Sequence, residues 1–570
     1  MDKPKDFYNI EYKRLDFNTT EKYLNRLIDN LKDSEDFNSF LEIFKKIIDI
    51  QNEIEEMFDY ADIRNMRDSS DEFYEGEIDY WNSSKIRFDN LFIPFYEEIL
   101  NSKYKNQLRD FVPEAFFLTL EYTKKVTNSN ITDLEVREKE LYKKYRNLIS
   151  GKVVYNGEEI NISKLMGLSK NNDRNKRKEI IDIYNAYFYQ NKKAFDEIFI
   201  ELIKIRKEIA LRLGFTNYSE YSLYKLRRFG YDYKDIHAFR DNIKKYILPL
   251  INKLRKTQED RLKIEKLEYY DTVFFSDPPK SIYEGEKLLE AIGSSLKEID
   301  TDLYDFYINF YKSGYIDLLN RDNKVGFNIT NYLSKSGLPV ITGNFKNNYK
   351  DITSTLHELG HGFQKYNASI MDKNYIVSPL LKYPTMEIAE MFSYALELIT
   401  LPHLSNLFEE ADYNKYCFEV IYDLINLLPY VCLVDEFQEQ IYLMDEITEE
   451  QIHGTWLTLA KKYNLEYQNT GNKNLEEGCF FFRQSHIFLN PFYYIDYGIS
   501  QIGAFVIASL CESDLEAFKN IASVASYYSI KELRDKYNLP DPFAEENISK
   551  LSKRLEKTLN TYNKGVEDEI

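Results

Sequence analysis

The chain of 570 residues is poor in cysteine, proline and glycine, with 4, 14 and 20 of these residues. The cysteines show no Cys-x-x-Cys spacing and lie at Cys417, Cys432, Cys479 and Cys511. We therefore expect neither a disulfide framework nor cysteine ligation of a metal, and we expect a reducing compartment. With so few helix-breaking residues beside abundant Leu, Ile, Lys and Glu, the composition predicts a mainly α fold.

The sequence also has no excess of basic residues. Lys and Arg number 75 against 94 Asp and Glu, so the formal net charge is -19. This acidic balance argues against a nucleic-acid partner. Residues 1–16 lack the apolar core of a signal peptide, and the apolar stretch at 502–511 is far short of a membrane span. We expect a cytoplasmic protein with no membrane partner, and the sequence leaves the oligomeric state open.

Histidine is scarce too, with six in the chain, yet His357 and His361 lie four residues apart in a His-Glu-x-x-His motif. On a helix both imidazoles would lie on one face, about 6 Å apart along the axis, and could reach one metal ion. Glu358 lies about 100° round the helix, where it could hold a metal-bound water. Two surface histidines are the alternative, although chance would supply the motif on the order of 0.005 times in such a chain.

The flanks of the motif predict an amphipathic helix. Its apolar stripe has offsets of 0, 4, 7 and 11 and consists of Ile352, Leu356, Leu359 and Phe363. Asp351 and Thr353 are the expected N-terminal capping residues. Gly360 and Gly362 each cost about 1 kcal/mol in a helix relative to alanine. These glycines therefore indicate that another backbone or a substrate comes close to the helix.

Two β-branched segments precede this helix, at 324–330 and 338–342, and they predict a small β-sheet. Pro339 cannot donate to a ladder, which favours an edge strand for the second segment. An exposed edge can hold an extended peptide by strand addition. The candidate substrate-binding residues are therefore Val340, Ile341, Thr342 and Gly343. The alternative, that a loop simply covers this strand edge, stays equally open.

A catalytic zinc site needs three protein ligands and an open position, and no third histidine closely follows His361. The segment that begins at residue 383 predicts a helix whose apolar stripe is Ile388, Phe392, Ala395 and Ile399. Glu390 and Glu397 lie on the opposite face, whereas Glu387 lies in the first turn and off that face. We expect Glu390 to be the third ligand and Glu397 to orient a ligating histidine. An exposed acidic helix face is the alternative.

The segment 479–497 places polar groups on an aromatic background. Tyr493 and Tyr497 are four residues apart and share a helical face, with Tyr494 beside both. Their hydroxyl groups, or His486, could donate to an oxyanion that forms on a scissile carbonyl. Because the chain has 48 tyrosines, a plain core or interface role is the alternative.

With these segments in hand, the chain resembles the thimet oligopeptidase superfamily of zinc peptidases, closest to its oligoendopeptidase F and Pz-peptidase branch. The resemblance covers most of the chain and is most specific over residues 314–500, in the segments 314–318, 342–345, 355–361, 383–390 and 486–497. The sequence departs from the usual pattern of this family at 326–330 and at Phe363-Gln364-Lys365. These departures concern the preference of the substrate subsites rather than the chemistry.

The resemblance implies a two-lobed helical ellipsoid with a deep central channel and a small β-sheet beside the metal helix. Residues 1–190 would form an N-terminal helical lobe that contributes to the channel wall. Residues 191–570 would form the catalytic region. The expected partners are short peptide substrates.

The expected activity is that of a zinc endopeptidase for short oligopeptides. One Zn²⁺ per chain would be held by His357, His361 and Glu390, with Glu358 as general base. The expected oxyanion donors are His486, Tyr493 and Tyr497, with Tyr494 as a substrate contact. Two alternatives stay open, a zinc exopeptidase of carboxypeptidase or dipeptidase type and a catalytically silent peptide-binding protein.

Overall fold

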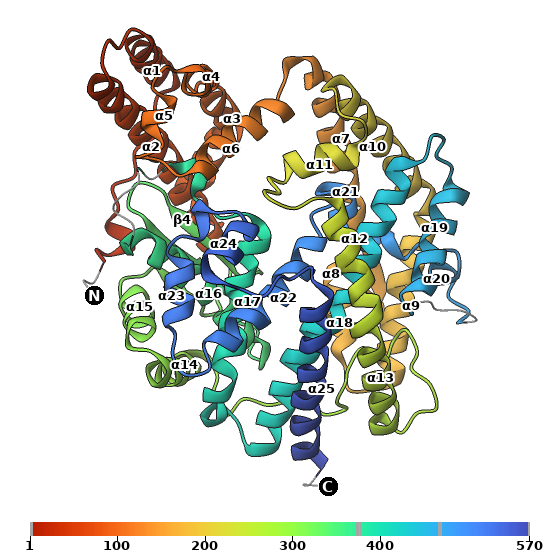
Figure 1. The fold of residues 1–570 in the computed structure, drawn as a ribbon. Helices are drawn as coiled ribbons and strands as arrows, with labels where there is room; N and C mark the ends of the chain where they lie inside the picture. The colour runs from red at the N-terminus through yellow and green to blue at the C-terminus, as the bar shows by residue number, and fades with distance from the viewer. Residues whose placement is uncertain (1–3, 372–375, 377, 466–469, 568–570) are drawn as a thin grey trace. The chain divides into compact units, whose positions relative to one another are not determined.

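The computed structural model describes residues 4–371, 376, 378–465 and 470–567. Helices make up most of it, which confirms the mainly α fold class (Figure 1). The chain divides into two compact units of three segments each. The first is Met1–Glu121, Lys280–Tyr416 and Ser500–Pro540, and the second is Tyr122–Pro279, Cys417–Ile499 and Asp541–Ile570. The lobe boundary at residue 190 and the central channel stay predictions.

The first unit begins with a group of helices and then carries a small sheet and the helices packed on it. Its helices are α1 (Phe17–Lys32), α2 (Phe37–Arg67), α3 (Glu72–Asn90), α4 (Ile93–Asn101), α5 (Lys105–Leu108), α14 (Gly285–Ile299), α15 (Thr301–Lys312), α16 (Lys350–Met371), α17 (Met386–Thr400), α23 (Glu516–Ala522) and α24 (Ile530–Tyr537). Its strands are β3 (Ile316–Asp317), β4 (Ile329–Leu333) and β5 (Leu338–Thr342).

The second unit contains the hairpin of β1 (Lys152–Tyr155) and β2 (Glu158–Asn161), which pair antiparallel. Its helices are α7 (Thr132–Ile149), α8 (Ile162–Gly167), α9 (Arg174–Gln190), α10 (Lys192–Arg212), α11 (Tyr218–Lys225), α12 (Tyr233–Asn242), α13 (Leu248–Leu262), α19 (Glu449–Lys462), α20 (Lys473–Glu476), α21 (Ser485–Leu489) and α25 (Glu545–Glu567). Three helices pass from one unit into the other, α6 (Glu114–Val126), α18 (Glu410–Leu443) and α22 (Ile495–Leu510).

The three-stranded sheet has the order β3-β5-β4, so β5 is its central strand. It pairs parallel with β3 and antiparallel with β4. The expectation that 338–342 is an edge strand is therefore wrong. The N–H of Ile341 donates to Tyr315 O at 2.8 Å, and the nitrogen of Pro339 points toward the same side, two residues earlier. β3 pairs only with Ile341 and Thr342 of β5. No hydrogen bond to β3 is therefore lost because Pro339 has no N–H group.

The end of α2 holds this sheet in place. Arg67 is fully buried, and its guanidinium donates to Thr342 Oγ1 at 3.0 Å and to the carbonyl oxygens of Gly314 and Ile341 at 2.7 and 3.1 Å. A buried guanidinium is stable only when its N–H groups are satisfied. Arg67 therefore ties α2 to both β5 and the turn before β3.

One helix, α18, is long and apolar enough to cross a membrane by length and composition. Within the structure, 72% of its apolar window is buried, and Pro429 lies inside it. A buried core helix meets the same criteria, so this one helix is weak evidence for a membrane span.

Candidate metal centre

The helices α16 and α17 pack unusually closely, and Gly360 of α16 is the reason. A Cβ atom at this position would lie 2.6 Å from Ser393 Cα and 2.7 Å from Phe392 O, both on α17. A Cβ atom at Gly362 would lie 3.1 Å from side-chain atoms of Ile341 on β5 and Phe306 on α15. Gly360 in the motif and Gly362 directly after it therefore let α17 and the sheet approach the helix that carries the histidines.

The apolar stripe of α16 is fully buried, as the periodicity predicts: Ile352, Leu356, Leu359 and Phe363. The expected capping residues do not cap the helix. The Asp351 carboxylate accepts the N–H groups of Lys346 and Asn348 at 3.0 and 3.1 Å, and so braces the turn before α16. The hydroxyl of Thr353 instead lies 3.1 Å from that of Tyr416.

His357, His361 and Glu390 come together at the contact of the two helices. One ligand atom from each of the three lies within 4.8 Å of the other two. Glu390 Oε2 lies 3.4 Å from His357 Nε2 and 3.7 Å from His361 Nε2. Two imidazoles and one carboxylate are a donor set of catalytic zinc sites, in which a fourth position stays open. The residues present therefore fit a zinc ion.

Other groups on α17 fix this arrangement. Glu397 Oε1 lies 2.7 Å from His357 Nδ1, which favours the tautomer that leaves Nε2 free for a metal. The hydroxyl of Ser393 donates to the Glu390 carbonyl at 2.8 Å and lies 3.4 Å from Glu390 Oε2. Glu387 is buried, and its carboxylate accepts the Thr385 hydroxyl at 2.8 Å.

Burial and hydrogen bonding set the charges of the three residues. Burial lowers the pKa of His361 to about 3. Burial would also lower the pKa of His357, but its hydrogen bonds to Glu390 and Glu397 raise it well above its usual value. Burial alone would raise the pKa of Glu390, but the hydrogen bond to His357 brings it down to about 2. An ionised carboxylate and a neutral imidazole are the forms that bind metals, and a metal would displace a proton from His357.

Glu358 lies on a different side of α16, against the sheet. Its Oε2 accepts the Thr330 hydroxyl of β4 at 2.6 Å. The side chain is buried, and burial raises its pKa. A carboxylate with a raised pKa is a stronger base near neutral pH. The sequence predicts a strand at 324–330, whereas β4 begins only at Ile329. Nothing in the sequence marks Thr330 as the partner of Glu358.

The predicted oxyanion donors and Tyr494 gather in the second unit. The His486 ring lies 4.8, 5.6 and 5.8 Å from the rings of Tyr494, Tyr493 and Tyr497. Burial lowers the pKa of His486 to about 4, so its imidazole is neutral at neutral pH. The Gln484 amide lies 2.7 Å from His486 Nδ1, which leaves Nε2 to carry the proton. The four residues form one aromatic cluster with several hydrogen-bond donors.

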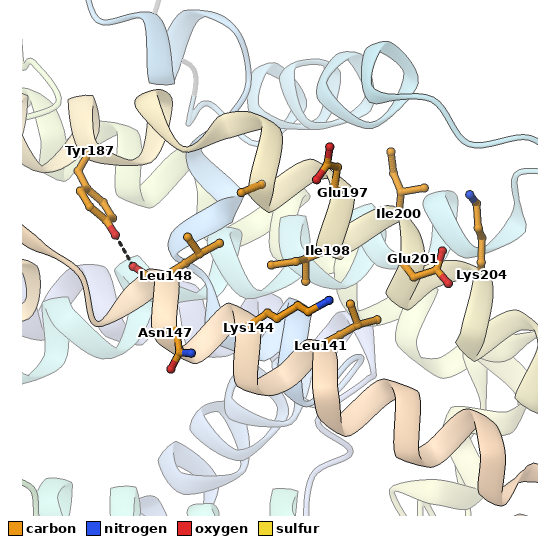
Figure 2. Close-up of a pocket in the computed structure, with 11 residues that line it drawn as sticks. Leu141, Lys144, Asn147, Leu148, Tyr187, Glu197, Ile198, Ile200, Glu201 and Lys204 are labelled. Atoms are coloured by element: carbon orange, nitrogen blue, oxygen red, sulfur yellow. Dashed lines mark hydrogen bonds between the residues drawn. The ribbon is translucent and has the colours of Figure 1, made fainter.

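A separate cavity of about 790 Å³ lies in the second unit between α7 and α10 (Figure 2). Its lining is aliphatic with a few charged groups: Leu141, Lys144, Asn147, Leu148, Tyr187, Ala194, Glu197, Ile198, Ile200, Glu201 and Lys204. The Tyr187 hydroxyl already donates to Leu148 O at 2.6 Å. None of the predicted site residues lines this cavity, so its size does not make it the reaction site.

Two family models match the chain, the peptidase M3 N-terminal domain over residues 7–127 and peptidase family M3 over residues 300–530. Among solved structures, Pz peptidase A with inhibitor 2 matches at a TM-score of 0.87 and 28% identity, over 97% of this chain and 99% of that chain. A protein assigned as an oligoendopeptidase F from Bacillus anthracis str. Ames matches at a TM-score of 0.83 and 26% identity, over 98% and 99%. Oligoendopeptidase-F from Enterococcus faecium shares the fold at a TM-score of 0.61 and 16% identity, over 97% and 99%. No curated protein matches the chain.

Proposed function

Because the chain belongs to peptidase family M3, in the branch of oligoendopeptidase F and Pz peptidase, we propose that it is a zinc endopeptidase. It hydrolyses internal peptide bonds of short oligopeptides. The observation that carries this proposal is the convergence of His357, His361 and Glu390 beside the buried carboxylate of Glu358. These three residues would hold one zinc ion per chain, which would supply Lewis-acid polarisation of the scissile carbonyl.

Glu358 acts as the general base. Its carboxylate takes a proton from the attacking water and later gives it to the leaving amine, a role that contributes about 10²–10⁴-fold in rate. The Thr330 hydroxyl holds one carboxylate oxygen and leaves the other oxygen for the water. Burial raises the pKa of Glu358, which strengthens it as a base.

The strand that takes an extended peptide is β4 rather than β5. Because β5 is paired on both sides, a peptide cannot add to it as a further strand. The predicted strand addition along Val340, Ile341, Thr342 and Gly343 is therefore not proposed. β4 ends the sheet, and its Thr330 holds Glu358. A peptide added along Ile329–Leu333 would therefore pass beside the general base.

The oxyanion donors in this proposal are His486, Tyr493 and Tyr497, with Tyr494 as a substrate contact. Their assignment rests on the family membership and on the clustering of their rings in the second unit. A neutral His486 with its proton on Nε2, and tyrosine hydroxyls, can each donate to a developing negative charge.

Cleavage of an internally quenched peptide that is blocked at both ends tests the proposal. We expect the purified chain to cut it at an internal bond, to lose the activity with a chelator and to regain it with one equivalent of zinc. An exopeptidase would leave the doubly blocked peptide intact but cut its unblocked form. A silent peptide-binding protein would cut neither peptide, with or without zinc.

A further inference from the structure

A buried lysine on α16 has no ionic partner in the described part of the chain. Lys365 is 4% exposed and lies seven residues after Glu358 on the same helix. Its ammonium lies 3.4 Å from the centre of the Tyr383 ring and 5.9 Å from that of Tyr332. Among the described residues no carboxylate lies within 4.0 Å of it and no hydrogen bond involves it. Buried ammonium groups are normally paired, so this exception calls for a reason.

A second lysine, Lys382, lies beside the same tyrosine ring but has an ionic partner. Lys382 lies over the same Tyr383 ring at 5.4 Å, and it forms an ion pair with Asp59 of α2. Burial, and after it the positive charge of Lys382, lowers the pKa of Lys365 well below its usual value, although Glu358, Asp59 and Glu390 act in the opposite direction. A further anion beside Lys365 would favour its charged form.

Lys365 and Glu358 lie against neighbouring positions of the same strand. Thr330 binds Glu358 and Tyr332 borders Lys365, and these two residues of β4 are two apart and so share a face. Along α16 the seven-residue separation corresponds to about 10 Å, which an extended peptide covers in about three residues. Tyr383 and Lys382 are partly exposed, so the surroundings of Lys365 are not sealed.

We propose that Lys365 binds a carboxylate of the peptide substrate, two or three residues from the bond that is cleaved. This rests on the proposed peptidase function and adds a substrate preference to it. The carboxylate comes from the C-terminus of a short peptide or from an Asp or Glu side chain. Lys365 is thus a specificity residue, because it touches the substrate away from the reacting atoms.

Matched peptides test the proposal. One pair has a C-terminal acid or amide, and a second series has Glu or Gln at the second and third positions on either side of the bond. We expect wild type to prefer the carboxylate form by about 10- to 100-fold in kcat/KM, mainly through KM. The pair of peptides that shows the preference identifies the source of the carboxylate.

Lys365→Met should abolish this preference, and Lys365→Arg, which keeps the charge, should retain part of it. The matched control is the double variant Asp59→Asn with Lys382→Met, which removes the neighbouring ion pair as a unit and should keep the preference. A wild-type ratio near one, or a preference that survives in Lys365→Met, would overturn the proposal. Thermal unfolding confirms that each variant is folded.

A binding measurement separates failure of the subsite from failure of the peptidase function. Fluorescence anisotropy with labelled peptides of both series on the Glu358→Gln chain needs no turnover. If wild type cuts no peptide but a carboxylate form still binds more tightly than its neutral partner in a manner that depends on Lys365, the function fails and the subsite stands. If wild type cuts the carboxylate and neutral members of every pair equally and binds them equally, the subsite fails and the function stands.

Discussion

Glu397 Oε1 lies 2.7 Å from His357 Nδ1, two helical turns along α17 from Glu390. This contact turns the other ring nitrogen of His357 toward Glu390 Oε2, 3.4 Å away. One helix therefore supplies a candidate ligand and also orients a second one on α16. A carboxylate that holds a ligating histidine in this way raises its basicity and fixes its ring.

Three glutamates of α17 should differ in their effect on zinc. Glu390→Ala should abolish tight binding because it removes a ligand, and Glu397→Ala should weaken binding about 10- to 100-fold because His357 loses its partner. Glu387→Ala should cost least, since that carboxylate accepts the Thr385 hydroxyl instead. Competition with a chromophoric chelator measures all three. Loss of zinc in Glu387→Ala with retention in Glu390→Ala would contradict the assignment.

Gly360→Ala should force α16 and α17 apart, because the new Cβ would lie 2.6 Å from Ser393 Cα. Overpacking of this kind costs about 1–3 kcal/mol, and zinc affinity should fall with it because Glu390 lies on α17. The control is Gly454→Ala in α19, where no atom lies within 4 Å of the new Cβ and a gain of about 1 kcal/mol is expected. Thermal unfolding and zinc titration should separate the two variants, and equal behaviour would refute the close-packing account.

The aromatic cluster of the second unit should act on turnover and not on metal binding. Tyr493→Phe and Tyr497→Phe should each keep one zinc while kcat falls, by up to about 10²–10³-fold for the main oxyanion donor. Tyr494→Phe should change kcat less, since Tyr494 is assigned to substrate contact. Zinc content and steady-state kinetics of the three variants check this. Unchanged kcat in both Tyr493→Phe and Tyr497→Phe would remove these residues from the mechanism.

Substrate size should be limited if the predicted channel exists. Peptides of up to roughly 20 residues can lie extended at about 3.3–3.6 Å per residue and should be cut internally. Folded proteins and large unfolded chains such as casein should survive. Mass spectrometry of timed digests decides this. Internal cutting of a large unfolded protein at the rate of short peptides would argue for an open cleft.

Helical periodicity alone predicts the candidate metal-site residues that the structure brings together. The faces of 350–371 and 386–400 depend only on local spacing. This spacing predicts His357, His361, Glu390 and Glu397 on the sides of the two helices that the structure brings together. Spacing along the chain also favoured Glu390 over Glu387.

The parts that sequence reasoning missed depend on pairing between distant segments. β5 becomes a central strand because β3, only two residues long, pairs with it, and so short a strand has no pattern of its own. Thr330 meets Glu358 across 28 positions, and Lys365 meets Tyr332 and Tyr383 only after the sheet and α16 have packed. The capping assignment of Asp351 failed because its carboxylate bonds to the preceding turn instead.

The most direct test of the central claim is the turnover of Glu358→Gln with its zinc content measured on the same sample. The substrate is a doubly blocked, internally quenched peptide, and wild type at one zinc per chain is the reference. The account predicts that Glu358→Gln also holds one zinc but cleaves about 10²–10⁴-fold more slowly or worse, because the general base is lost. Near-normal cleavage by the zinc-loaded Gln variant would contradict it.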